Sequence, residues 1–202
     1  MKNKFRQSPI NINSHGNIDI SKIGLLQTYY QNSITCDLMH TGNFLRLQKF
    51  ENQYLIFNNT KYYLKDIHYH GPSEHKFNME KSAVECHMVH FNEANNAILV
   101  LGIMIEKGSN ESTHGIIFDS IPQYNQTKEI TINLNDLIVE GGFYTYAGSL
   151  TTPPFTENVQ WVVFRNKKYI NENSVQNYLN NFPVNARKCH DCSNTIVFES
   201  RH

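Results

Sequence analysis

The sequence predicts a mainly β (α+β) fold, a sheet with a few peripheral helices, and three observations support this prediction. Most segments are short, rich in Ile, Val, Tyr and Phe, and bounded by Asn, Gly or Pro, as is typical of strands joined by turns. A length of 202 residues with 40% hydrophobic residues suffices for one core and is short for two. No repeat, linker or change of composition divides the chain, so we expect one domain over residues 1–202.

The expected strands follow from hydrophobic runs of suitable length. Segments 44–50 and 54–57 are interpreted as the two strands of a hairpin. The clearest further strands are segments 62–70, 84–91, 98–105, 161–164 and 195–198.

Two segments have helical character. Ile116, Ile117 and Ile121 suggest a short turn of helix within segment 112–121. In segment 174–182, apolar residues recur at i, i+3, i+4 and i+7, and Ser174 is available as the N-cap.

Charge and hydropathy limit the partners that this chain can have. Eighteen Lys and Arg balance 18 Asp and Glu, so no basic surface favours nucleic acid. The apolar run 97–105 is too short to span a bilayer. The basic first residues are not followed by an apolar segment, so we predict no signal peptide and a cytoplasmic location. The alternative location is outside the cell or in the periplasm, with the signal peptide removed. The sequence leaves the oligomeric state open between a monomer and a homodimer.

The four cysteines are too few and too scattered for a disulfide scaffold. Cys189 and Cys192 form a single C-x-x-C, whereas a structural zinc site of this type requires a second pair. A local disulfide and two free thiols both remain open for this pair.

A histidine pattern gives the strongest functional signal. His68 and His70 lie two residues apart on one expected strand, so their side chains share a face; Glu85 and His87 do the same on a later strand. If the two strands pair antiparallel, three imidazoles converge. Three neutral imidazoles with an open fourth position are the pattern of a catalytic zinc site, so we predict bound Zn2+. The alternative is a polar face or a satisfied core.

A second segment, Tyr146-Ala147-Gly148-Ser149-Leu150-Thr151-Thr152-Pro153-Pro154, is a rigid turn that carries hydroxyl groups. Its two prolines fix φ and remove two backbone donors. By itself this segment is compatible with an ordinary loop, and only its combination with the histidines suggests a function.

Together these motifs resemble the alpha carbonic anhydrases. Gln7-Ser8-Pro9-Ile10-Asn11-Ile12 is similar to the opening motif of that family. The H-x-H pair, the Ser-Glu-His, the Glu-x-His-x-Val-His, the Ser-Leu-Thr-Thr-Pro-Pro and a late Asn-x-Arg follow in family order over about residues 7–198. The resemblance implies a large twisted, mostly antiparallel central sheet with zinc at the base of a conical cleft.

The resemblance also implies an activity, the reversible hydration of CO2 to bicarbonate and a proton by zinc-bound hydroxide. His68, His70 and His87 would be the metal ligands, and Thr151 would orient the hydroxide while donating to Glu74. Glu85 would support His87, and Asn185 belongs to the same supporting group around the ligands. An apolar CO2 pocket would be lined by Val89, Val100, Leu150, Val159 and Trp161, with Thr152 beside the bicarbonate.

Two departures from the family pattern bear on the rate. Asn43 occupies the position of the proton-shuttle histidine of fast members, and Asn does not titrate, so slower turnover is expected. His40 is the nearest substitute, but strand alternation directs it away. Asp66 stands where the family usually has a Gln that supports the first ligand, and a carboxylate there would make His68 more basic unless it points to solvent or pairs with a lysine.

Two other functions compete with hydration. Some relatives of this family have lost zinc ligands and serve as protein- or glycan-binding modules, but here the three histidines, Thr151 and Glu74 are all present. Hydrolysis of activated esters is a second alternative, although no dedicated acyl pocket is evident.

Overall fold

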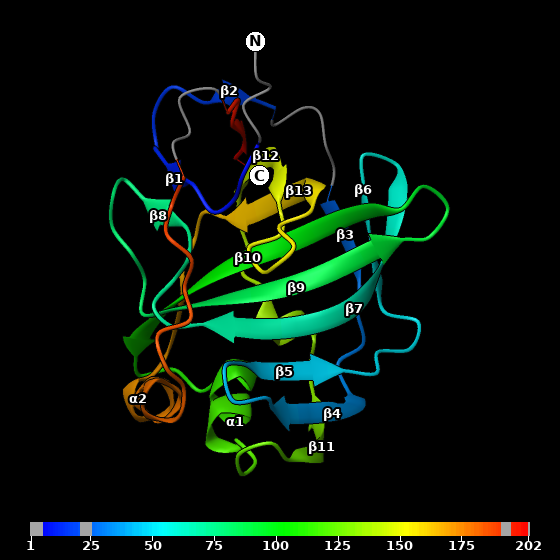
Figure 1. Ribbon diagram of the computed structural model, residues 1–202. Helices are drawn as coiled ribbons and strands as arrows, with labels where there is room; N and C mark the ends of the chain where they lie inside the picture. The colour runs from blue at the N-terminus through cyan, green and yellow to red at the C-terminus, as the bar shows by residue number, and fades with distance from the viewer. Residues whose placement is uncertain (1–5, 21–25, 191–194, 202) are drawn as a thin grey trace.

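A twisted sheet of 13 strands forms the frame of the protein in the computed structural model, which describes residues 6–20, 26–190 and 195–201 (Figure 1). Ten strands follow one another in the order β11-β4-β5-β7-β9-β10-β13-β12-β15-β2, while β3 and β6 extend the sheet beside β7, and β14 pairs with β10. In the described part of the chain, this sheet is parallel only at β10–β13, β10–β14 and β15–β2. The mostly antiparallel, mainly β fold expected from the sequence is therefore confirmed.

The strands of this sheet have the following bounds: β2 Ile18–Asp19, β3 Leu26–Tyr29, β4 Ile34–His40, β5 Leu45–Gln48, β6 Tyr54–Phe57, β7 Thr60–His70, β9 Val84–Asn92, β10 Ala97–Gly108, β11 Thr127–Ile132, β12 Phe143–Ser149, β13 Glu157–Phe164, β14 Lys168–Asn171 and β15 Phe198–Ser200. A separate two-stranded sheet consists of β1 Asn11–Ile12 and β8 Lys76–Phe77. The helices are α1 Thr113–Asp119, α2 Glu172–Asn181 and the short 3-10 helix η1 Asn135–Leu137.

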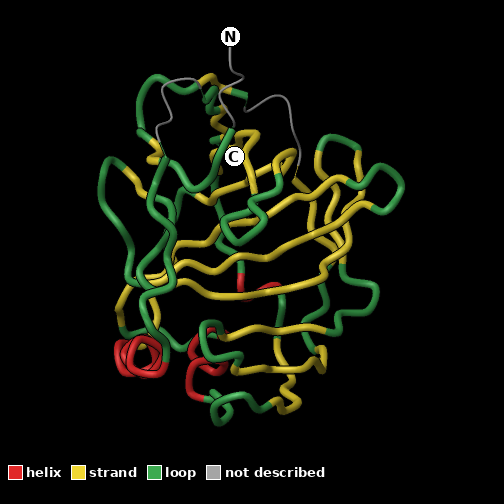
Figure 2. The backbone as a smooth tube through the Cα atoms, in the orientation of Figure 1, coloured by secondary structure: helices red, strands yellow, loops and turns green. Residues whose placement is uncertain are grey.

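The two faces of the central strands have different roles. In β10, Leu99, Leu101 and Ile103 belong to the main core, while Val100 and Met104 belong to a smaller apolar cluster on the opposite face. The helices α1 and α2 pack against each other, lie together at the lower left in Figure 2, and bury Ile117, Phe118 and Tyr178 in the main core. The other face is thereby left for a site. None of the described helices has the length and hydrophobicity needed to cross a membrane.

The expected hairpin between segments 44–50 and 54–57 is wrong. β5 pairs with β4 and β7, whereas β6 pairs with β3 and β7. The tight turn lies one strand later, at Asn58 and Asn59, whose φ angles are 48° and 60°. A two-residue hairpin turn that matches strand twist requires positive φ at both positions, which Asn tolerates, so the hairpin joins β6 to β7.

Two smaller expectations also need correction. The helix α2 begins three residues earlier than expected from its cap: Asn171 is the N-cap and accepts from the Asn173 amide, while Ser174 donates to Asp119. Only Phe198 of the expected strand 195–198 lies in β15. The Ile18 amide donates to the Val197 carbonyl, but β15 still begins at Phe198 and not at residue 195.

Candidate metal centre and active site

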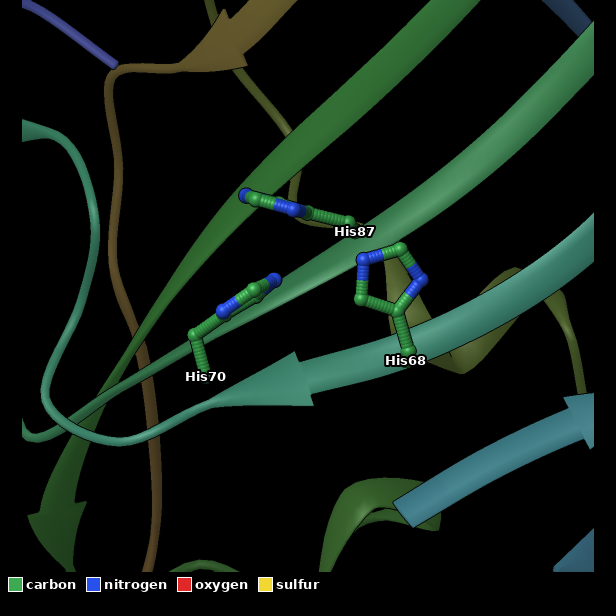
Figure 3. Close-up of side chains that lie close together, drawn as sticks. All are labelled: His68, His70 and His87. Carbon is green, nitrogen blue, oxygen red and sulfur yellow. The ribbon is translucent and has the colours of Figure 1, made fainter. Parts of the chain in front are cut away.

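Three histidines meet on the face of the sheet opposite the helices (Figure 3). His68 and His70 come from β7, and His87 comes from β9, directly opposite His68 in an antiparallel register. One ring nitrogen of each lies within 4.8 Å of the others. The antiparallel pairing assumed from the sequence therefore brings the three imidazoles together.

The hydrogen bonds of these histidines determine which nitrogen each can offer to a metal. His68 Nδ1 donates to Asp66 Oδ2 at 2.6 Å, and His87 Nε2 donates to Glu85 Oε1 at 2.9 Å. His70 Nδ1 donates to the Asn185 carbonyl at 3.3 Å. Because carboxylates and carbonyls only accept, the other nitrogen of each imidazole is the one left for a metal: Nε2 in His68 and His70, and Nδ1 in His87.

These free nitrogens fit a divalent metal. His70 Nε2 is buried without a hydrogen-bond partner, which is costly unless a ligand binds it. Burial lowers the pKa of His70 well below its usual value and that of His87 to about 4, so both rings are neutral at physiological pH. Three neutral imidazoles with one open side are the donor set that zinc uses in catalytic sites.

Glu85 anchors the strand–loop junction behind His87. Its Oε2 accepts from the backbone amides of Glu74 and His75, both at 2.8 Å, and its Oε1 accepts from His75 Nδ1 at 2.7 Å. Burial raises the pKa of Glu85, but His75 and His87 more than compensate and hold it well below the usual value. The side chain is therefore an ionised acceptor with no freedom to rotate.

His75, which sequence reasoning left without a role, continues this network. Its Nε2 lies 2.6 Å from the Tyr146 hydroxyl, which in turn lies 2.9 Å from Ser8 Oγ. The Ser-Glu-His motif was the only signal that could have marked it, because its partners lie 10 and 71 residues away.

The support behind His68 is an ion pair rather than a lone carboxylate. Asp66 is buried, and its Oδ1 contacts Arg46 Nη2 at 2.8 Å and Nε at 3.0 Å. Burial raises the pKa of Asp66, but His68 and Arg46 together lower this pKa by more than burial raises it, so the net shift is downward. Asp66 therefore shares a face with His68 as expected, but it pairs with an arginine, not with solvent or a lysine.

Thr151 and Glu74 lie beside the histidines. Burial raises the pKa of Glu74 to about 8, opposed by hydrogen bonding from the Thr151 hydroxyl and from the Arg187 amide. Glu74 Oε1 accepts from that amide at 2.7 Å and lies 3.4 Å from His70 Nδ1. The structure thus brings Thr151, Glu74 and the histidines into one network.

An apolar wall adjoins the histidines. The Trp161 and His87 rings make a T-shaped contact with their centroids 4.9 Å apart. Of the five residues expected to line a CO2 pocket, Val100, Val159 and Trp161 belong to the smaller apolar cluster, and the partly buried Val89 and Leu150 pack against it. Thr152 lines an adjoining pocket of about 250 Å3 together with Phe44, Arg46, His68 and Pro153.

Asn43 lies on the loop before β5 and its side chain is exposed. Its carbonyl accepts from Asn185 Nδ2 at 2.7 Å, which connects this loop to the carbonyl that supports His70. His40 is buried, packs against the Phe182 ring and accepts from the Gly42 amide at 3.1 Å. It is thus directed away from the three histidines, as strand alternation predicts.

The C-x-x-C pair is only half described. Cys192 lies outside the described residues, and Cys189 is described as a free thiol that donates to the Glu74 carbonyl.

Comparison with known proteins agrees with this geometry. The family model for eukaryotic-type carbonic anhydrase matches residues 1–197. A carbonic anhydrase of Nostoc sp. is 30% identical, over 96% of this chain and 76% of its own, and dioscorin dioA3 of Dioscorea japonica is 30% identical, over 91% and 74%. A carbonic anhydrase from Chlamydomonas reinhardtii solved with acetazolamide superimposes with a TM-score of 0.87 at 27% identity, over 96% of this chain and 90% of that one. The chain belongs to the eukaryotic-type, or alpha, carbonic anhydrase family.

Proposed function

We propose that this protein catalyses the reversible hydration of CO2 to bicarbonate and a proton, with zinc held by His68, His70 and His87. The observation that carries the proposal is the convergence of three imidazoles that each keep one free nitrogen. Bound zinc supplies the Lewis acidity that makes a hydroxide nucleophile available near pH 7, a property for which carbonic anhydrase itself is the reference case.

The residues around the metal would orient the reactants. The Thr151 hydroxyl donates to Glu74, so only its lone pairs remain to accept a hydrogen bond from the nucleophile, whose attack on CO2 is thereby directed. CO2 has no charge and no dipole, and the apolar cluster around Val100, Val159 and Trp161 offers it a surface without competing hydrogen bonds. Thr152 would contact the bicarbonate product at the pocket.

Stopped-flow CO2 hydration, with zinc content determined on the same sample, tests this function. We expect about one zinc per chain and turnover well above that of buffer, lost with a chelator and restored by added zinc. Zinc without turnover would contradict hydration and favour the protein- or glycan-binding alternative. The outcome is informative because the chain is also similar to dioscorins, one of which was solved in complex with ascorbate.

Asn43→His should accelerate turnover by restoring a titratable group at the shuttle position. Each hydration releases a proton, and an imidazole that titrates near neutral pH can carry it to buffer. We expect a rise of about ten-fold in dilute buffer and a much smaller rise in concentrated buffer, which replaces the shuttle. Equal rates for the two proteins in both buffers would contradict the shuttle assignment.

A further inference from the structure

Arg46 lies on the metal-facing side of the sheet, next to His68. It occupies β5 opposite His68 in β7, and Asp66 precedes His68 by two residues on the same face. Gln48 lies two residues beyond Arg46 and its Nε2 reaches Asp66 Oδ1 at 3.3 Å. A basic, an acidic and an amide side chain therefore gather around one nitrogen of a candidate metal ligand.

Each carboxylate oxygen of Asp66 has at least one donor. Oδ2 accepts from His68 Nδ1 at 2.6 Å, and Oδ1 accepts from Arg46 Nε at 3.0 Å, with Arg46 Nη2 at 2.8 Å. The Asp66 side chain is 10% exposed and that of Arg46 is 38% exposed. The pair is thus partly shielded from water, and its charges compensate each other more effectively than those of a fully exposed pair.

An uncompensated carboxylate in this position would disturb the metal. Bonded to His68 Nδ1, it would draw the ring proton, increase the electron density at Nε2 and make the metal a weaker Lewis acid. A neutral acceptor would not do so. The guanidinium of Arg46 supplies the missing positive charge at the same carboxylate.

We propose that Arg46 is a positioning residue which holds Asp66 and offsets its charge, so that Asp66 supports His68 Nδ1 as a neutral acceptor would. This inference rests on the proposed zinc site. In this proposal the Arg46–Asp66 pair acts on His68 Nδ1 in the same way as one neutral hydrogen-bond acceptor would. Arg46 also lines the pocket that contains Thr152, so a direct effect on pocket anions has to be separated from an effect through Asp66.

Four variants test the proposal: Arg46→Met, Arg46→Lys, Asp66→Asn and the double variant Arg46→Met/Asp66→Asn. Two quantities are measured for each, the zinc dissociation constant of the apoprotein by chelator competition and the pH–rate profile of CO2 hydration. In Arg46→Met, His68 and Gln48 still hold Asp66, so the change is mainly one of charge. We expect zinc to bind about ten-fold more tightly and the midpoint of the profile to rise by on the order of one pH unit.

Arg46→Lys keeps the charge and should stay within about 0.3 pH unit of wild type. In the Asp66→Asn background, the guanidinium is no longer held at the site, so removing it should change the zinc dissociation constant by no more than about two-fold. An equal change in both backgrounds would mean that Arg46 acts on the metal or the pocket directly, which overturns the proposal. Unchanged zinc affinity in Arg46→Met also overturns it. Wild-type zinc binding without turnover would refute the proposed function alone, since the affinity measurements still decide the role of Arg46.

Discussion

His87→Ala is expected to reduce CO2 hydration to the rate of buffer alone. His87 is buried, offers Nδ1 to the metal position and is fixed by Glu85 through Nε2. Removing one of three protein ligands should weaken zinc binding by roughly a hundred- to a thousand-fold, if each ligand contributes roughly a quarter of a binding free energy of about 10–16 kcal/mol. Zinc content after dialysis and stopped-flow rates measure both effects.

The matched control for this variant is His90→Asn, on the same strand. His90 is equally buried but faces the main core, where Nε2 accepts from the Tyr30 hydroxyl and Nδ1 donates to the Met88 carbonyl. Its loss should cost about 1–3 kcal/mol of unfolding free energy because buried partners lose their hydrogen bonds. Zinc content should not change. If both variants lose zinc equally, the loss reflects general destabilisation and not ligation.

Thr151→Val should lower kcat/KM by about 100-fold while zinc content stays at wild-type level. Valine matches the shape of threonine but neither donates to Glu74 nor accepts from the nucleophile, so the orientation of attack is lost. Removing one preorganised polar group at a reaction centre typically costs 10²–10³-fold. Steady-state CO2 hydration by the zinc-loaded variant provides the measurement.

Thr156→Val is the control for this second prediction, because Thr156 lies five residues further along the same loop and its side chain is exposed. Its rate should remain within about two-fold of wild type. A fall of less than about five-fold in Thr151→Val would contradict the orienting role of the hydroxyl.

The convergence of the three histidines was predictable because strand alternation is a local property. His68 and His70 share a face by spacing alone, and one assumption, an antiparallel neighbour, adds His87. The same reasoning placed Asp66 beside His68 and directed His40 away from the site. The alternation of side chains along strands thus predicts a site when its residues lie on strands that are neighbours in the sequence.

Contacts between distant segments were beyond this reasoning. Arg46 meets Asp66 only because β5 pairs with β7, whereas the sequence suggested that β5 pairs with the strand that follows it. The turn at Asn58 and Asn59 was the missed signal, since two residues with positive φ join β6 to β7 and leave β5 free for another neighbour. The contact of His75 with Tyr146 likewise depends on the tertiary arrangement across 71 residues.

The place of β7 and β9 within the sheet has a consequence for how the protein loses its activity. Both strands have neighbours on each side, whereas β11 and β2 form the ends of the strand order. Amide protons of central strands exchange only when most of the molecule opens, while end strands fray at low cost. The ligands of the proposed site thus belong to the unit that opens last, and thermal inactivation is thereby tied to global unfolding instead of local fraying.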